Sequence, residues 1–185
     1  GLLFSGSAPS AMRLIFANHD QPFKHQADIV EIDPLTLRAT VDIVNRGFVQ
    51  TGRQPGGVAG LIYQFTGGHP LRTMQAAHFA WLHAVDAPAD QTWGRAREAI
   101  RRSARPSLSS MYEQLPVTQQ KVLRILAQSG SIYGTAARIL DLPKGSAQQA
   151  LRSLTDDGHV LGGGEALPRV TDPFLTDWLA LTHPL

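Results

Sequence analysis

The residues best suited to bind a ligand form one short stretch, Gly67-Gly68-His69-Pro70, between two predicted helices. Glycine lets a partner approach the backbone closely, and proline offers a flat apolar ring without a competing N–H donor. These properties allow a partner to come close to the chain at this stretch. The structural alternative is a helix stop at the glycines followed by a helix start at the proline.

The residues that phosphate chemistry needs do not accompany this stretch. No loop of the form Gly-x-x-x-x-Gly-Lys-Ser/Thr precedes it, and the pair Lys144-Gly145 has the reverse order. A catalytic base or a magnesium-binding acidic pair would also lie upstream, at the end of an earlier strand. We therefore assign no catalytic residue and expect no hydrolysis of ATP by this chain alone.

Two further groups of polar residues have simple interpretations. His78 and His83 lie five residues apart without a cysteine or an intervening glutamate, so we predict no metal site. Arg97, Arg101 and Arg105 recur every four residues along one predicted helical face. We interpret this row as a solvated surface, with contact to a phosphate or an acidic partner as the alternative.

The overall composition is globular, with 43% hydrophobic and 17% charged residues in a chain of 185. Cysteine is absent, which excludes disulfides and fits a cytoplasmic protein. No apolar run approaches the roughly 18 residues of a membrane helix, so no membrane partner is expected. Residues 1–112 hold 11 Lys/Arg against 8 Asp/Glu, and residues 113–185 hold 6 against 7. The second part is thus nearly neutral, which weakens any prediction that it binds nucleic acid.

The first 35 residues have the pattern of a strand, a helix and a strand. The chain opens on the apolar run Leu2-Leu3-Phe4 without an initiator Met, and Ser7 can cap a following helix. Ile29, Val30 and Ile32 favour a second strand before Asp33-Pro34. This order is typical of the edge of a parallel sheet.

Residues 36–106 are predicted to form four helices. Thr36 is the expected N-cap of the first, Gly67-Gly68 stops the second and Pro70 starts the third. The fourth runs from Trp93 to Ala104 and is expected to end at Pro106. The segment 103–115, with this proline and four serines, is the predicted hinge.

Residues 111–185 are predicted to form a winged-helix domain. Helical patterns begin after Pro116, around Ala136 and at Ser146, and two short strands flank Gly162-Gly163-Gly164. The last of these helices and the wing present polar residues able to contact bases or phosphates. The predicted DNA-binding residues are Lys144, Ser146, Gln148, Gln149, Arg152 and Arg169.

Three motifs in order resemble one protein family. They are Phe4-Ser5-Gly6-Ser7, then Gly67-Gly68-His69-Pro70, then the run 170–179 that begins Val-Thr-Asp-Pro-Phe-Leu. The chain resembles the C-terminal half of archaeal-type ATPases, AAA-related switch ATPases in which a winged helix follows the lid. The resemblance implies that Ser5 and Ser7 sit at a phosphate sensor and that Gly68, His69 and Pro70 lie at the adenine. ATP and Mg are the implied ligands of the intact protein, and we expect neither to bind this chain tightly.

The predicted fold is mainly α with a few short strands. It comprises the remnant of an α/β ATPase core (1–35), a helical lid (36–106) and a winged-helix domain (111–185). The predicted function is that of the C-terminal part of an ATP-binding regulatory ATPase whose winged helix binds double-stranded DNA. Two alternatives stay open: a stand-alone winged-helix DNA-binding regulator, and a winged helix used only for docking a protein partner or for self-association.

Overall fold

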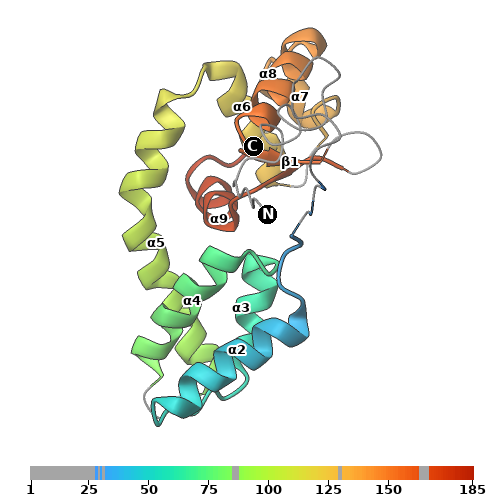
Figure 1. The fold of residues 1–185 in the computed structure, drawn as a ribbon. Helices are drawn as coiled ribbons and strands as arrows, with labels where there is room; N and C mark the ends of the chain where they lie inside the picture. Colours follow the sequence, from blue (N-terminus) through green and yellow to red (C-terminus); the bar gives the residue numbers. More distant parts are fainter. Residues whose placement is uncertain (1–27, 29, 31, 85–87, 129–130, 163–166) are drawn as a thin grey trace. The chain divides into compact units, whose positions relative to one another are not determined.

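The computed structural model describes residues 28, 30, 32–84, 88–128, 131–162 and 167–185 (Figure 1). Its contacts divide the chain into two compact units. One, which we call the helical unit, comprises Pro34–Leu115 and Asp172–Pro184. The other takes Gly1–Asp33, Pro116–Thr171 and Leu185, and we call its Pro116–Thr171 part the three-helix module. The strand predicted at 2–4, the helix after it and the residues Ser5 and Ser7 lie outside the described residues.

The helical unit begins as the sequence predicts. Helix α2 spans Leu37–Gln50, and the Thr36 hydroxyl caps it by accepting a hydrogen bond from the Ala39 amide at 3.2 Å. Helix α3 spans Val58–Thr66 and ends at Gly67, whose left-handed backbone (φ 58°) lets its N–H reach the Tyr63 carbonyl at 2.8 Å. Helix α4 spans Pro70–His83, with proline in its first turn.

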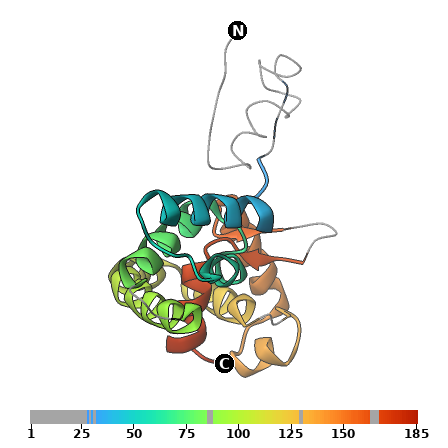
Figure 2. The ribbon, with the colours of Figure 1, turned by 90° about the horizontal axis from the view of Figure 1, so that it is seen from below.

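Helix α5 spans Ala89–Gln114 and packs along α4 (Figure 2). The core between the helices consists of small and branched apolar side chains that are almost fully buried, such as Ile62, Ala76, Ala80, Ala96 and Ile100. One polar pair lies among them, because the Thr66 and Thr73 hydroxyls bond to each other at 2.9 Å. A buried hydroxyl without a partner would be costly, so this bond explains how α3 and α4 tolerate two threonines in the core.

The predicted end of the fourth helix at Pro106 is wrong. Pro106 lies inside α5, which continues to Gln114, so most of the predicted hinge 103–115 is helical. An interior proline removes one helical hydrogen bond and costs about 3 kcal/mol. Pro106 is exposed, whereas Leu108 and Tyr112 in the following turns are buried. Burying two such side chains, at about 1.5–3 kcal/mol each, offsets the cost of the proline.

The C-terminal helix α9, Pro173–Thr182, packs against α5 and α3. By its contacts it therefore belongs to the helical unit, whereas the predicted domain 111–185 includes it. Its buried face inserts Phe174 beside Phe65, with ring centroids 5.6 Å apart, and Trp178 beside Tyr112 at 5.5 Å. The periodicity of apolar residues in a sequence does not say which neighbouring element covers them.

Two aspartates, at the N-cap and within α9, neutralise arginines of the helical unit. The Asp172 carboxylate pairs with the Arg72 guanidinium through both of its oxygens, and it also accepts a hydrogen bond from the Phe174 amide at 2.9 Å. The Asp177 carboxylate, only 8% exposed, pairs with both Arg97 and Arg101. Two arginines of the predicted row, Arg97 and Arg101, thus have an acidic partner within this chain, whereas the third, Arg105, is exposed.

The arginines also set the charge state of Asp177. Burial acts to raise the pKa of this carboxyl, but hydrogen bonds from Arg101 and Arg97, together with their charges, lower the pKa below its usual value. The hydrogen bond with Asp177 raises the pKa of Arg101 in turn. The buried carboxylate is therefore ionised at neutral pH.

The three-helix module has the predicted order of helices and short strands. Helices α6 (Val117–Ala127), α7 (Thr135–Ile139) and α8 (Lys144–Asp156) are followed by strands β1 (Val160–Leu161) and β2 (Arg169–Val170). The strands pair antiparallel, with Val160 opposite Val170. Between α7 and α8 the backbone turns at Asp141 (φ 47°), a residue type that tolerates this left-handed conformation. The described part of the chain is thus mainly helical with two short strands, as predicted.

The second strand predicted in the first 35 residues is not found at the residues that the structure describes there. Val30 and Ile32 have no strand assignment and are 81% and 92% exposed. A strand requires a hydrogen-bonded neighbour, and no described residue pairs with either of them. The other residues of this predicted strand, Ile29 and Glu31, and its predicted neighbour at 2–4 lie outside the described residues.

The ion pairs of Asp177 predict an acid-dependent stability. Asp177→Asn should lower the free energy of unfolding by about 2 kcal/mol at pH 7, because the variant replaces charged hydrogen bonds with neutral ones. The pKa of Asp177 is lower in the folded state than in the unfolded state, where it is about 3.9. The stabilisation is therefore complete at a pH above the unfolded-state pKa, and it is lost as the pH falls through the folded-state pKa. Urea unfolding followed by tryptophan fluorescence from pH 7 to pH 3 should show the two proteins converging. Asp42→Asn, at an exposed carboxylate of α2, is the control; a gap as large at pH 3 as at pH 7 would contradict the assignment.

Candidate functional site

The predicted ligand-contact stretch forms the tight connection between α3 and α4. Gly67 and Gly68 both have left-handed backbone conformations, with φ of 58° and 77°. His69 is the N-cap of α4, and its Nδ1 atom accepts from the Arg72 amide at 3.5 Å. The helix stop and helix start that formed the structural alternative are therefore both present.

Gly68 is required by a close contact within the chain. Its carbonyl accepts a hydrogen bond from the Leu35 amide at 2.9 Å, and a Cβ atom at Gly68 would lie 2.0 Å from the Leu35 carbonyl oxygen. No side chain fits at that distance. The segment before α2, at Leu35, thus occupies the space beside Gly68 that the missing side chain leaves open.

His69 and Pro70 remain accessible beside this contact. His69 is half-buried and Pro70 is exposed. An exposed proline ring next to an imidazole can pack against a flat apolar group such as a purine base. Neither residue is a lysine or an arginine, the side chains that most often bind phosphate.

The predicted DNA-binding residues are divided among the exposed side of α8, the groove beside α6 and strand β2. Lys144, Gln148, Gln149 and Arg152 are exposed, and Arg169 is exposed on β2. Helical spacing places Lys144, Gln148 and Arg152 in one row, away from the buried Ala147, Ala150 and Leu154. Ser146 is half-buried and faces α6 instead.

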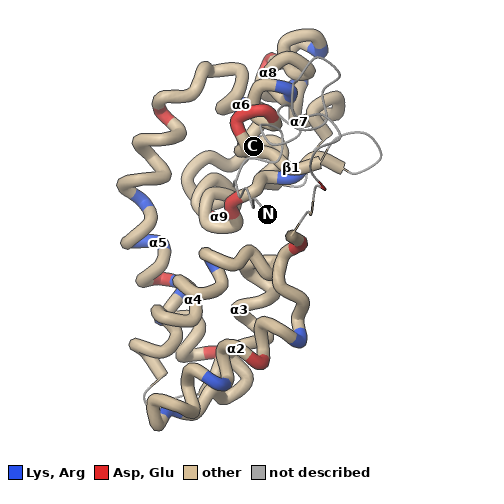
Figure 3. The backbone as a smooth tube through the Cα atoms, in the orientation of Figure 1, with Lys and Arg blue, Asp and Glu red and all other residues tan. Residues whose placement is uncertain are grey.

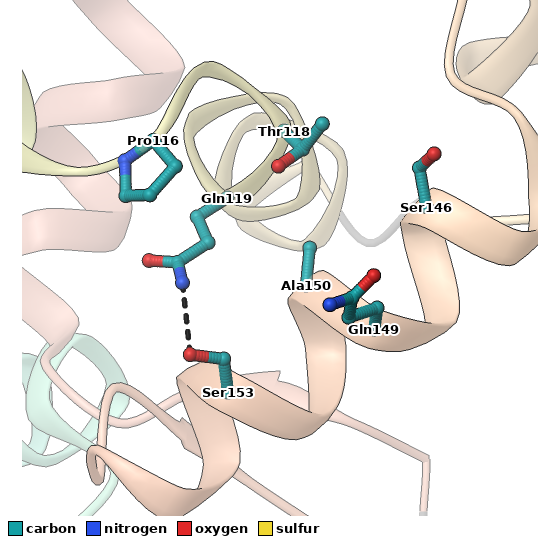
Figure 4. Close-up of a pocket in the computed structure, with 7 residues that line it drawn as sticks. All are labelled: Pro116, Thr118, Gln119, Ser146, Gln149, Ala150 and Ser153. Carbon is teal, nitrogen blue, oxygen red and sulfur yellow. Dashed lines mark hydrogen bonds between the residues drawn. The ribbon is translucent and has the colours of Figure 1, made fainter.

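A shallow groove runs between α6 and α8 beside this row (Figure 4). Its volume is about 280 Å³, and Thr118, Gln119, Ser146, Gln149 and Ser153 supply its polar lining. Gln119 donates a hydrogen bond from Nε2 to the Ser153 hydroxyl at 2.9 Å, which ties the two helices together. The residues that line the groove carry no charge, and the groove continues the polar surface of α8.

The position of α9 changes the charge balance of the module. Asp172 and Asp177 pair with arginines of the helical unit and do not belong to the module. Within Pro116–Thr171 the sequence holds six Lys/Arg against four Asp/Glu. Because Glu113, Asp172 and Asp177 lie outside Pro116–Thr171, the nearly neutral balance of residues 113–185 becomes a formal charge of +2 for the module.

Tyr133 is a candidate surface residue that the sequence interpretation missed. Its side chain is 53% exposed just before α7, and the Lys144 ammonium lies 5.7 Å from its ring centroid. A cation over an aromatic face is attracted by about 0.5–1 kcal/mol at an exposed site, so Tyr133 helps to position Lys144. In the sequence, Tyr133 stands next to Gly134, directly before a short predicted helix, and this position indicated a residue at a turn on the surface.

Metal ligands and membrane segments can be considered only for the described part of the chain. There, no three His, Asp or Glu side chains lie close enough together to hold a metal ion. None of the described helices combines the length and the apolar character needed to cross a bilayer.

Comparison with known proteins identifies a similar fold. No family model and no curated protein matches the chain. A solved structure of a Walker-type ATPase from Pyrococcus abyssi superposes on it with a TM-score of 0.70 and 14% sequence identity. The match covers 95% of this chain and 51% of the ATPase chain, so the chain spans about half the length of that protein. The fold is therefore related to part of a Walker-type ATPase, which confirms the coarse part of the predicted resemblance.

The two glycines before α4 provide a matched pair of variants. Gly67→Ala should cost about 1–2 kcal/mol, the strain of a left-handed alanine, because nothing lies within 4 Å of its new Cβ. Gly68→Ala adds the clash with Leu35 and should cost about 3 kcal/mol or more. Equilibrium urea unfolding of both variants measures the difference. Equal destabilisation would show that Leu35 is not held against Gly68.

Proposed function

We propose that this chain is the C-terminal part of an ATP-binding regulatory ATPase of the archaeal type, in which the three-helix module is a winged helix that binds double-stranded DNA. The observation that carries the DNA-binding part is the exposed polar and basic row of α8 in a module of formal charge +2. The likeness in fold to a Walker-type ATPase supports the ATPase part.

In this proposal α8 enters the major groove and the strands support it. Gln148, Gln149 and Arg152 have the amide and guanidinium groups that bond base edges. Lys144, placed by the Tyr133 ring, and Arg169 on β2 would contact phosphates. Asp156 and Asp157 at the end of α8 are exposed and would repel the backbone, so contact should be centred on the N-terminal two-thirds of the helix.

The helical unit acts as a nucleotide lid in the same proposal. His69 and Pro70 would pack against the adenine of ATP, and Gly68 would hold the loop in place through Leu35. The phosphates and Mg need a phosphate loop and acidic ligands, which no described residues supply. Tight ATP binding is therefore expected only when those elements are provided by the rest of an intact ATPase.

Protein docking is the second candidate function of the module. Val117, Ile139 and Leu167 are large apolar side chains that are 65%, 64% and 89% exposed. Exposed apolar residues of this size are typical of protein contact sites when they cluster. They lie outside the row of α8, so variants of that row separate the two functions.

Fluorescence anisotropy with a mixed-sequence DNA duplex at about 50 and 200 mM salt tests the proposal. The Lys144→Ala and Arg152→Ala substitutions together should weaken binding and reduce the salt slope by about 0.9 for every phosphate that the variant no longer binds. Arg46→Ala removes an exposed arginine of α2 and is the control, which should bind like the wild type. Absence of binding at low salt, or an unchanged affinity in the α8 variant, would reject DNA binding by α8 and favour protein docking.

A further inference from the structure

Helix α5 carries a second set of arginines besides those that pair with Asp177, and its basic positions are coloured blue in Figure 3. Arg95, Arg102 and Arg105 are exposed. At 100° and 1.5 Å per residue, they fall within an arc of about 80° and a length of about 15 Å. We call these three residues the α5 arginine face.

This face differs from the arginines that α9 neutralises. Arg97 and Arg101 point to the buried Asp177 and are held there. Among the described residues, Arg95 and Arg105 have no carboxylate partner. Arg102 lies 3.6 Å from Glu98, but both side chains are about two-thirds exposed, so this i,i+4 pair is weak. The face keeps a net positive charge that nothing within the described chain compensates.

The rest of the exposed surface of α5 argues against a protein partner. Between Gly94 and Ser110 the exposed residues are arginines, serines, one glycine, one proline and one glutamate. No large apolar side chain of α5 is exposed. Protein interfaces rely on buried aromatic or aliphatic anchors, whereas interfaces with nucleic acid are polar and positively charged. Arginine also matches phosphate geometry through two parallel hydrogen bonds.

We propose that the α5 arginine face binds the phosphate backbone of nucleic acid, as a surface separate from α8. The contact is independent of sequence, because it is made to phosphates and not to base edges. It belongs to the helical unit, so it requires neither the winged-helix assignment nor base contacts by α8. The proposal thus goes beyond the proposed DNA binding of the module.

The test compares two double variants that remove the same charge. Arg95→Gln/Arg105→Gln changes the α5 face, and Arg38→Gln/Arg46→Gln changes two exposed arginines of α2 in the same unit. Each variant of the 185-residue chain is titrated with two duplexes of unrelated sequence at several salt concentrations. The α5 variant should lower the salt slope by about 1–2 on both duplexes alike, at about 0.9 per phosphate contact, and the α2 variant should not. Circular dichroism checks that both variants keep the helical content of the wild type.

The outcomes separate this inference from the proposed function. An unchanged slope in the α5 variant overturns the inference, and so does an equal decrease in the α2 variant, which would indicate a general charge effect. A lowered slope in the α5 variant together with an unaffected Lys144/Arg152 variant supports the α5 face and rejects binding by α8. No DNA binding by the wild-type protein rejects both and leaves an acidic protein as the partner to seek.

Discussion

The architecture of the helical unit depends on two aspartates of the C-terminal segment and the arginines that meet them. Asp177 is almost fully buried, and a buried carboxylate is stable only when its charge is matched and its oxygens are bonded. Arg97 and Arg101 supply both conditions, and Arg72 does the same for Asp172 at the start of α9. These contacts give α9 a specific position in the helical unit, where Phe174 and Trp178 complete an aromatic core.

The same ion pairs shape the surfaces that remain for binding. By retaining Asp172 and Asp177, the helical unit leaves Pro116–Thr171 with an excess of basic residues. By engaging Arg97 and Arg101, α9 leaves the outer arginines of α5 to meet a partner from outside. The ion pairs within the fold therefore determine which basic residues remain available at the two candidate nucleic-acid surfaces. The net charge of the chain does not show this distribution.

Local features of the sequence predicted much of this structure. The cap at Thr36, the stop at Gly67 and the start at Pro70 depend on short-range backbone geometry, and each was confirmed. The outward row of α8 followed from helical periodicity. The predictions failed where contacts distant in sequence determine the structure. Buried side chains beyond Pro106 keep α5 continuous, and Asp177 of α9 pairs with Arg97, which lies 80 residues away in sequence. Tyr133 was missed because its contact with Lys144 exists only after the turn brings them together.

The central claim is that α9 is an integral part of the helical unit and that Asp172 and Asp177 hold it there. Hydrogen exchange measured by mass spectrometry on the wild type and on Asp172→Asn/Asp177→Asn tests this most directly. In the wild type, the backbone amides of α9 and α5 should be protected from exchange to a similar degree. In the variant, both helices should lose protection together, while α6 and α8 keep theirs. Two results would show that these aspartates do not hold α9 in the helical unit. One is that the amides of α9 exchange at the rates of those in α6 and α8; the other is that α9 loses protection in the variant while α5 does not.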